Sequence, residues 1–182
     1  MNESLVRIEN AGSVIWSASE RCYFFSRSNL LTSLFDEVIP ESHIVYESLT
    51  AEQQYLLKEC GITENFRVLT YTDNSSNAIA FPLEMYFDYS SHCNLRCPGC
   101  YNQRHLDNKS FNVNDIIKVI SELYDLGIMR LHLAGGEPTL DYEKLEVYLT
   151  TAQKYNVVTS MATNGTLLTE SMCALLMNTD LF

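Results

Sequence analysis

The sequence predicts an α/β protein in which three strand–loop–helix units follow a smaller α+β segment. Two observations support this fold class. Beyond residue 79, short apolar runs alternate with longer runs that have helical spacing. Each of the three apolar runs also ends in a loop rich in cysteine, glycine or asparagine. Strands that alternate with helices form a parallel sheet with right-handed crossovers, so the three loops should share one edge, where such sheets bind ligands.

Residues 1–78 are expected to form a small α+β accessory domain. Its first ten residues are polar and are expected to fray. Two short runs of β-branched and aromatic residues then predict a hairpin, Ser13–Ser17 with Cys22–Ser26. Helices are predicted over Asn29–Val38 and from the N-cap Thr50, with Gln53 in a capping box and Gly61 as the stop. The remaining predictions are strands at Ile44–Tyr46 and Phe66–Thr72 and a turn-rich domain boundary at Asp73–Asn77.

Residues 79–182 carry the repeated units. The apolar–polar alternation from Leu83 to Tyr89 predicts a half-buried first strand. The apolar stretches at 128–134 and 157–162 predict the second and third strands. Helical spacing predicts three helices, with Asn112, Asp141 and Thr169 as their N-caps. The first helix is expected to stop at Gly127 and the last at about Met177.

Charge and hydropathy exclude several classes of partner. The formal net charge is −11 and is spread over both halves of the chain, so no basic stripe suggests a nucleic-acid partner. A membrane partner is not expected either, because no apolar run approaches the roughly 18 residues that a membrane helix needs. No signal peptide is visible at the N-terminus. These features predict a cytoplasmic protein, in which clustered cysteines are more often metal ligands than disulfides.

Three of the six cysteines, Cys93, Cys97 and Cys100, fall within eight residues directly after the first strand. Thiolates are soft ligands suited to iron–sulfur clusters and zinc. A cubane cluster normally takes four cysteines, so three would leave one iron open. The alternatives are a zinc site completed by His92 or His105, and a chance grouping of free thiols. The isolated Cys22, Cys60 and Cys173 are expected to be buried structural thiols.

The second and third loops are Gly135-Gly136-Glu137-Pro138 and Thr163-Asn164-Gly165. Paired glycines allow close backbone approach to a ligand, and a carboxylate with carbonyl oxygens would suit an ammonium group. Plain turns are the alternative for both loops. His132, within the second strand, is expected to be an interior, hydrogen-bonded histidine. Arg96, between the cysteines, is either a charge that tunes a cluster or an ordinary solvated side chain.

The cysteine spacing together with the glycine–glutamate loop resembles the radical S-adenosylmethionine (SAM) superfamily over roughly residues 83–180. The resemblance implies a partial (βα)6 barrel, of which residues 79–182 would supply the N-terminal half, truncated after the third unit. It implies a 4Fe–4S cluster on Cys93, Cys97 and Cys100, with SAM chelating the open iron. Gly135, Gly136 and Glu137 would bind the SAM amino group. An external electron donor of the flavodoxin or ferredoxin type would reduce the cluster, and the 5′-deoxyadenosyl radical from SAM would abstract a hydrogen atom from substrate.

Two departures from the family pattern matter. The family often has an aromatic residue just before the last cysteine, near the adenine, whereas this chain has Gly99 there. Tyr101 is expected to substitute in that cofactor contact, and Asn164 is expected to add another. The family core usually has six βα units, so the chain is expected to be a fragment or a truncated product. Its third strand should then expose an edge.

Gly-Gly-Glu-Pro-Thr-Leu and Thr-Asn-Gly-Thr-Leu-Leu are similar to the peptide-modifying and cofactor-maturing members of the superfamily. The sequence therefore predicts a radical SAM enzyme that acts on a peptide or protein substrate. Residues 1–78 resemble leader-peptide-recognition domains. One alternative is a glycyl-radical-enzyme activase, favoured by Cys-Pro-Gly-Cys-Tyr-Asn. Another is a truncated, non-catalytic module that binds metal or peptide.

Overall fold

The computed structural model describes residues 4–9, 12–26, 41–71, 81–102, 109–179 and 181. The chain forms two compact units, Met1–Pro82 and Leu83–Phe182, and each is considered by itself. The helix predicted over Asn29–Val38 and the break predicted at Asp73–Asn77 lie outside the described residues. So does the boundary expected between residues 78 and 79.

The first unit contains a five-stranded sheet in the order β3-β2-β1-β5-β4. The predicted hairpin is confirmed, because β2 and β3 pair antiparallel. The expectation that residues 1–10 fray is wrong for Ser4–Glu9, because this strand, β1, lies between β2 and β5 at the centre of the sheet. The strands are β1 (Ser4–Glu9), β2 (Gly12–Ser17), β3 (Cys22–Ser26), β4 (Glu41–Ile44) and β5 (Phe66–Thr70).

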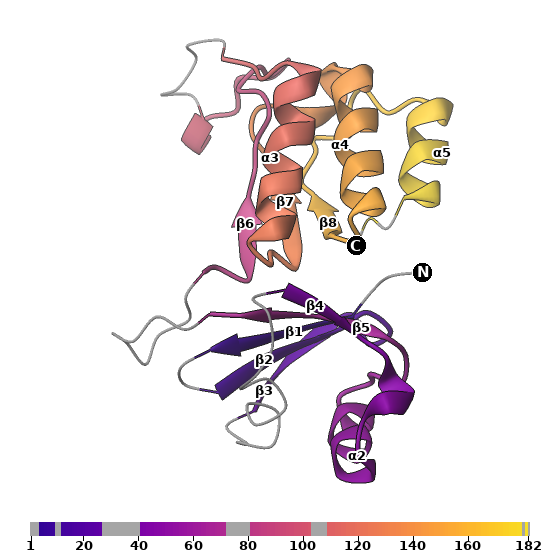
Figure 1. Ribbon diagram of the computed structural model, residues 1–182. Helices are drawn as coiled ribbons and strands as arrows, with labels where there is room; N and C mark the ends of the chain where they lie inside the picture. The colour runs from indigo at the N-terminus through magenta and orange to yellow at the C-terminus, as the bar shows by residue number, and fades with distance from the viewer. Residues whose placement is uncertain are drawn as a thin grey trace. The chain divides into compact units, whose positions relative to one another are not determined.

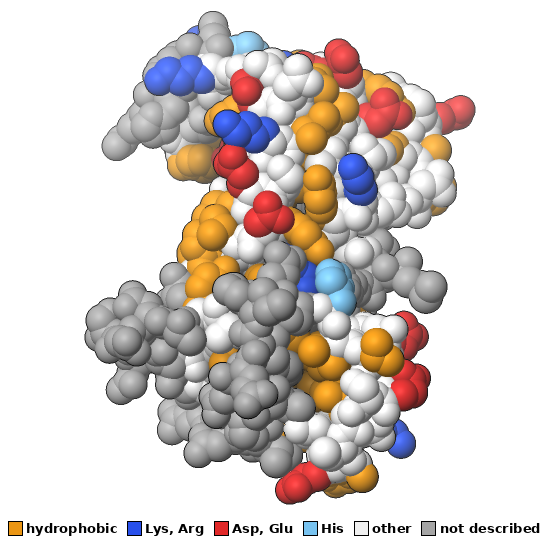
Figure 2. All heavy atoms as spheres, viewed as in Figure 1, with side chains coloured by type: hydrophobic (Ala, Val, Ile, Leu, Met, Phe, Trp, Pro, Cys, Tyr) orange, Lys and Arg blue, Asp and Glu red, His pale blue; other side chains and the backbone are white. Residues whose placement is uncertain are grey.

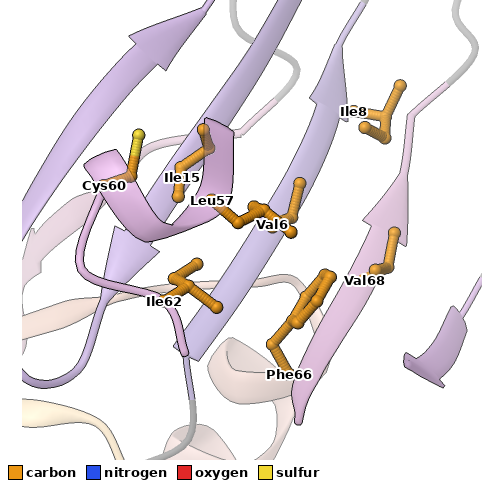
Figure 3. Packing of buried hydrophobic residues seen from close by; sticks show 8 residues of the cluster. All are labelled: Val6, Ile8, Ile15, Leu57, Cys60, Ile62, Phe66 and Val68. Atoms are coloured by element: carbon orange, nitrogen blue, oxygen red, sulfur yellow. The ribbon is translucent and has the colours of Figure 1, made fainter. Parts of the chain in front are cut away.

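One face of this sheet packs against helix α2 (Ala51–Glu59), and Figure 3 shows the core between them. A 3-10 turn, η1 (Tyr46–Ser48), follows β4 where a strand was expected to continue. The predicted capping box is present: the Thr50 side chain accepts from Gln53 N and the Gln53 side chain accepts from Thr50 N. The core residues are Val6, Ile8, Ile15, Leu57, Cys60, Ile62, Phe66 and Val68.

The three isolated cysteines divide between core and surface. Cys60 is buried as expected, and burial raises the pKa of its thiol. Cys22 and Cys173 are exposed, so the expectation of buried structural thiols is wrong for these two. Cys22 begins the outermost strand β3, and Cys173 lies on the last helix of the second unit, so neither position requires burial.

The second unit contains the predicted parallel sheet, in the order β6-β7-β8. Figure 1 shows α3, α4 and α5 side by side over this sheet. The predicted N-caps Asn112, Asp141 and Thr169 are all confirmed, since each side chain accepts a backbone N–H in the first turn. The elements are β6 (Glu84–Tyr86), α3 (Val113–Asp125), β7 (Arg130–Leu133), η3 (Pro138–Leu140), α4 (Tyr142–Lys154), β8 (Val158–Met161) and α5 (Glu170–Asn178).

The two faces of this sheet differ in character. On the helix-facing side, the Tyr148 ring of α4 packs against Phe87 and Tyr89, which follow β6. On the opposite side, His132 of β7 contacts Glu84 Oε2 through Nε2 at 3.1 Å and Ser160 Oγ through Nδ1. His132 is hydrogen-bonded, as the sequence predicted, but it is half-buried rather than interior.

The free side of β8 is partly covered. Leu181 pairs in parallel with Thr159, which already pairs with Leu131 of β7 on its other side. The expected exposed edge is therefore interrupted at Thr159, because the chain returns to the sheet after α5.

Surface charge does not single out a site on the helical face. Over α3, α4 and α5, acidic and basic side chains are interspersed with apolar ones (Figure 2). In the described part of the chain, none of the helices has the length and apolar character needed to span a membrane.

Candidate functional site

A pocket of about 340 Å³ opens beside the loop that follows β6. Its volume lies within the range of small-molecule sites, roughly 300–1,000 Å³. The three clustered cysteines all line it, together with a glycine from the loop after β7. Its lining residues are Cys93, Leu95, Arg96, Cys97, Cys100, Asn102 and Gly136.

The cysteine loop has a backbone geometry suited to thiolate ligands. Cys100 N donates to Cys97 O at 3.2 Å across a tight turn, and Gly99 in that turn has a φ of +79°. Proline followed by a positive-φ glycine is typical of a type II turn, so the backbone of this turn favours glycine at position 99. Leu95 N lies 3.4 Å from Cys93 Sγ, and such N–H donors stabilise a thiolate.

These observations fit an iron–sulfur cluster. The three thiols line one pocket, so all three could act as ligands of one cluster. His105, the other histidine considered for zinc, lies outside the described residues.

The two glycines of the second loop are required by the protein's own backbone. A Cβ on Gly136 would lie 1.9 Å from His92 O, and a Cβ on Gly135 would lie 2.5 Å from Ser90 O. Hydrogen bonds accompany this close approach, from Gly136 N to Ser90 O and from Glu137 N to His92 O. The loop after β7 is therefore packed directly against the segment that leads into the cysteines.

Glu137 connects the second loop to the third. The residue is only 3% exposed, and its carboxylate accepts four hydrogen bonds. The donors to Oε1 are Thr139 N at 3.0 Å, Thr139 Oγ1 at 2.5 Å and Thr163 Oγ1 at 2.6 Å. Asn164 N donates to Oε2 at 2.8 Å. The carboxylate thus fixes the loop after β8, a role that its sequence position alone does not indicate.

These contacts keep Glu137 ionised. Burial by itself would raise the pKa of its carboxyl, but the hydrogen bonds from Thr139, Thr163 and Asn164 outweigh burial and lower the pKa below its ordinary value. A negative charge is thereby held beside the pocket-lining Gly136. An ammonium contact by Glu137 stays a prediction.

Hydrogen bonds from Tyr101 and Asn102 fix the chain directly after Cys100. Tyr101 Oη donates to Gly135 O at 3.3 Å, although the residue is 65% exposed. Desolvation and the nearby Asp88 carboxylate raise the pKa of its phenol, so it stays a hydrogen-bond donor. Asn102 is buried and donates from Nδ2 to Ser91 O at 3.0 Å. Sequence reasoning missed Asn102, although the residue lies next to Tyr101 in the quoted motif.

The remaining predicted site residues are also placed by the structure. Arg96 is exposed and lines the pocket beside the cysteines. Asn164 meets the cysteine loop through its side chain, since Nδ2 donates to Asn94 Oδ1 at 3.0 Å. All the predicted metal and cofactor residues therefore lie on three loops at the carboxyl ends of β6, β7 and β8, and direct contacts join those loops.

Known proteins resemble this chain in sequence and in fold. The PqqA peptide cyclase of Bradyrhizobium diazoefficiens is 31% identical over 98 residues, which cover 53% of this chain and 26% of the cyclase. The PqqA peptide cyclase of Methylobacterium nodulans is 31% identical over 86 residues, which cover 46% of this chain and 22% of that cyclase. The chain thus spans about a quarter of the length of the curated relatives it matches.

Among solved structures, SuiB of Streptococcus suis has a similar fold. SuiB bound to the precursor peptide SuiA gives a TM-score of 0.65 at 18% identity, and SuiB bound to S-adenosylmethionine gives 0.65 at 20%. Both alignments cover 98% of this chain and 45% of SuiB. At this level of identity the likeness establishes the α/β fold.

A family model decides the assignment. The model of the radical SAM superfamily matches residues 88–181, just over half of the chain. The match contains the cysteine loop, Glu137 and the loop after β8, which are the parts that the structure brings together. The chain belongs to the radical SAM superfamily.

Proposed function

We propose that this chain provides the cluster-binding and SAM-binding part of a peptide-modifying enzyme. Radical SAM proteins use a 4Fe–4S cluster and SAM. When bound, these groups supply a 5′-deoxyadenosyl radical that abstracts a hydrogen atom from substrate. The observation that supports the proposal best is the single pocket lined by Cys93, Cys97, Cys100 and Gly136. It places three thiols and the glycine–glutamate loop around one space.

The roles of the protein's own residues follow from their contacts. The three thiolates would hold the cluster, and the backbone at Gly135 and Gly136 would receive the amino group of SAM. Glu137 holds the third loop in place through Thr163 and Asn164, and its charge favours a cationic group nearby. Tyr101, fixed on Gly135 O, is the aromatic ring proposed to contact the adenine. Pro138 and Thr139 are buried behind this edge, which excludes water from one side of it.

A peptide or protein is the proposed substrate. Support comes from the PqqA peptide cyclases and from SuiB, whose solved structure contains a precursor peptide. The first unit offers a surface suited to an extended peptide. Its strand β3 is the last in the sheet order, and Tyr23 and Phe25 on it are 37% and 62% exposed. An edge strand with apolar side chains can bind a peptide as an additional strand. We therefore propose leader-peptide recognition for residues 1–78.

The proposed location is the cytoplasm. A reducing compartment favours free thiols over disulfides and so keeps the three cysteines available as ligands. Reduction of the cluster requires an external one-electron donor, for which the flavodoxin and ferredoxin classes are proposed.

Anaerobic reconstitution of the full chain with iron and sulfide tests this function. The expected product has a broad absorption shoulder near ~400 nm, typical of thiolate-ligated clusters. Cys97→Ala should lose this absorption, whereas Cys173→Ala, a change at an exposed cysteine on α5, should keep it. A colourless protein with one equivalent of zinc would exclude the cluster.

The second stage is addition of dithionite and SAM, which should release 5′-deoxyadenosine. A protein that binds the cluster but releases no 5′-deoxyadenosine would be a binding module rather than the proposed enzyme. Titration with a synthetic leader peptide, followed by tryptophan fluorescence, tests the first unit separately, because Trp16 lies 6.5 Å from the Tyr23 ring.

A further inference from the structure

A closed ring of side-chain hydrogen bonds joins the cysteine loop to the loop after β8. Asn94 Nδ2 donates to Thr166 Oγ1 at 2.9 Å, and Thr166 Oγ1 donates to Asn164 Oδ1 at 2.6 Å. Asn164 Nδ2 closes the ring by donating to Asn94 Oδ1 at 3.0 Å. Each member donates once and accepts once within the ring, an arrangement in which hydrogen bonds polarise and strengthen one another. We call these three residues the Asn94 latch.

The latch is anchored to the buried Glu137. Asn164 N donates to Glu137 Oε2, and Thr163 Oγ1 donates to Oε1 while accepting from Gly165 N at 3.0 Å. Thr166 N also donates to the Asn164 side chain at Oδ1, at 2.9 Å, which fixes the turn that carries the latch. The exposed Asn94 is therefore connected, through the third loop, to a carboxylate that the protein buries.

Asn94 occupies a sensitive position in the cysteine loop. It directly follows Cys93 and lies three residues before Cys97, while Tyr101 and Asn102 hold the loop beyond Cys100. Cys97 and Cys100 thus lie between the contacts of Asn94 on one side and those of Tyr101 and Asn102 on the other, and Cys93 directly precedes Asn94. A loop that is ordered before its ligand arrives loses less conformational freedom on binding.

We propose that Asn94 and Thr166 are positioning residues for the cluster, and that Asn164 acts with them as a latch rather than as a cofactor contact. This inference rests on the proposed cluster binding. The latch holds the chain between Cys93 and Cys97, and would thereby orient these two thiolates for binding the cluster. Groups that orient metal ligands typically change metal affinity by 10- to 100-fold when they are removed, so the latch should control how firmly the cluster is retained.

The deciding variants are Thr166→Val and its matched control Thr166→Ser. Valine is close to threonine in shape but lacks the hydroxyl, so it removes two of the three ring bonds. Serine keeps the hydroxyl and therefore the ring. Asn94→Ala repeats the test from the other loop, at an exposed position where the backbone tolerates alanine. Far-ultraviolet circular dichroism before reconstitution confirms that each chain is folded.

Two measurements on the reconstituted full chain follow. The first is the rate of cluster loss to an iron chelator, read from the absorption near ~400 nm; it should rise roughly ten-fold in Thr166→Val and Asn94→Ala and stay near wild type in Thr166→Ser. The second is the electron paramagnetic resonance spectrum of the dithionite-reduced cluster. Its change on adding SAM should be weakened by the same two variants, a result that a purely structural role in folding would not give.

The possible outcomes separate this inference from the proposed function. If wild type binds no cluster, the proposed function fails and the latch fails with it. If wild type binds a cluster but Thr166→Val and Asn94→Ala lose it within twofold of the wild-type rate, with an unchanged spectrum, the latch proposal is wrong and the proposed function stands.

Discussion

Thr163 Oγ1 donates a 2.6 Å hydrogen bond to Glu137 Oε1 and thereby joins the loops after β7 and β8. The bond is charge-assisted, and the acceptor is buried. Glu137 therefore holds the loop after β8 in place, in addition to being part of the loop after β7.

Glu137→Gln should destabilise the second unit by about 2–3 kcal/mol, because an amide NH₂ would face donors and the remaining bonds would lose their ionic partner. Urea unfolding followed by circular dichroism measures this loss. Glu146→Gln, at an exposed position on α4, serves as the control and should change stability by less than about 0.5 kcal/mol. Equal losses of stability in Glu137→Gln and Glu146→Gln would show that the hydrogen bonds to Glu137 do not stabilise the second unit.

The lowered pKa of Glu137 predicts a pH dependence. The group's pKa in the folded chain lies below its ordinary value of 4.5, so its stabilising contribution is complete above that value and is lost as the pH falls through the lowered pKa. The difference in unfolding free energy between wild type and Glu137→Gln should therefore be largest near neutral pH and shrink in acid. A difference that grows below pH 4.5 would contradict the ionised state assigned here.

Gly136→Ala and Gly99→Ala should differ sharply in how much they lower the free energy of unfolding. Gly136→Ala would place a methyl group 1.9 Å from His92 O, so the loops must separate and the second unit should unfold or lose several kcal/mol. The methyl group added by Gly99→Ala would meet no atom within 4 Å. The substitution should therefore destabilise the unit only by the strain of a positive φ at alanine, about 1–2 kcal/mol. Urea unfolding of both variants gives the ranking, and a milder effect for Gly136→Ala would show that the loops can move apart.

Arg96→Gln should make the reduced cluster harder to form. Arg96 lines the pocket with the cysteines, and its positive charge favours the added electron. Its removal should lower the reduction potential by tens of millivolts, whereas Arg96→Lys should stay closer to wild type. Potentiometric titration of the reconstituted chain measures both, and an unchanged potential in Arg96→Gln would identify Arg96 as a solvated side chain.

The second unit could be predicted largely from its sequence because its signals are local. Helical caps, alternating strands and glycine stops all depend on neighbours within a few residues, and the N-caps predicted at Asn112, Asp141 and Thr169 are confirmed. The three loops could also be assigned to one edge, since parallel topology alone requires it.

The buried polar residues and the contacts between loops could not be predicted from the sequence, because they depend on partners far apart in the chain. Strand β1 looks polar in sequence because Arg7 and Glu9 interrupt its apolar residues, yet Arg7 is fully buried and its Nη2 donates to the distant Phe81 O at 2.8 Å. The burial of Glu137 and the contact between Asn94 and Asn164 likewise join residues separated by tens of positions. Spacing patterns do not register such pairs, because each residue alone looks like an ordinary polar loop residue.

The near-contact between Gly136 and His92 couples two loops that are far apart in the chain. Because not even one methyl group fits between them, neither backbone can shift toward the other without displacing it. A substitution that moves the loop after β7 is therefore expected to move the segment that leads into Cys93 as well.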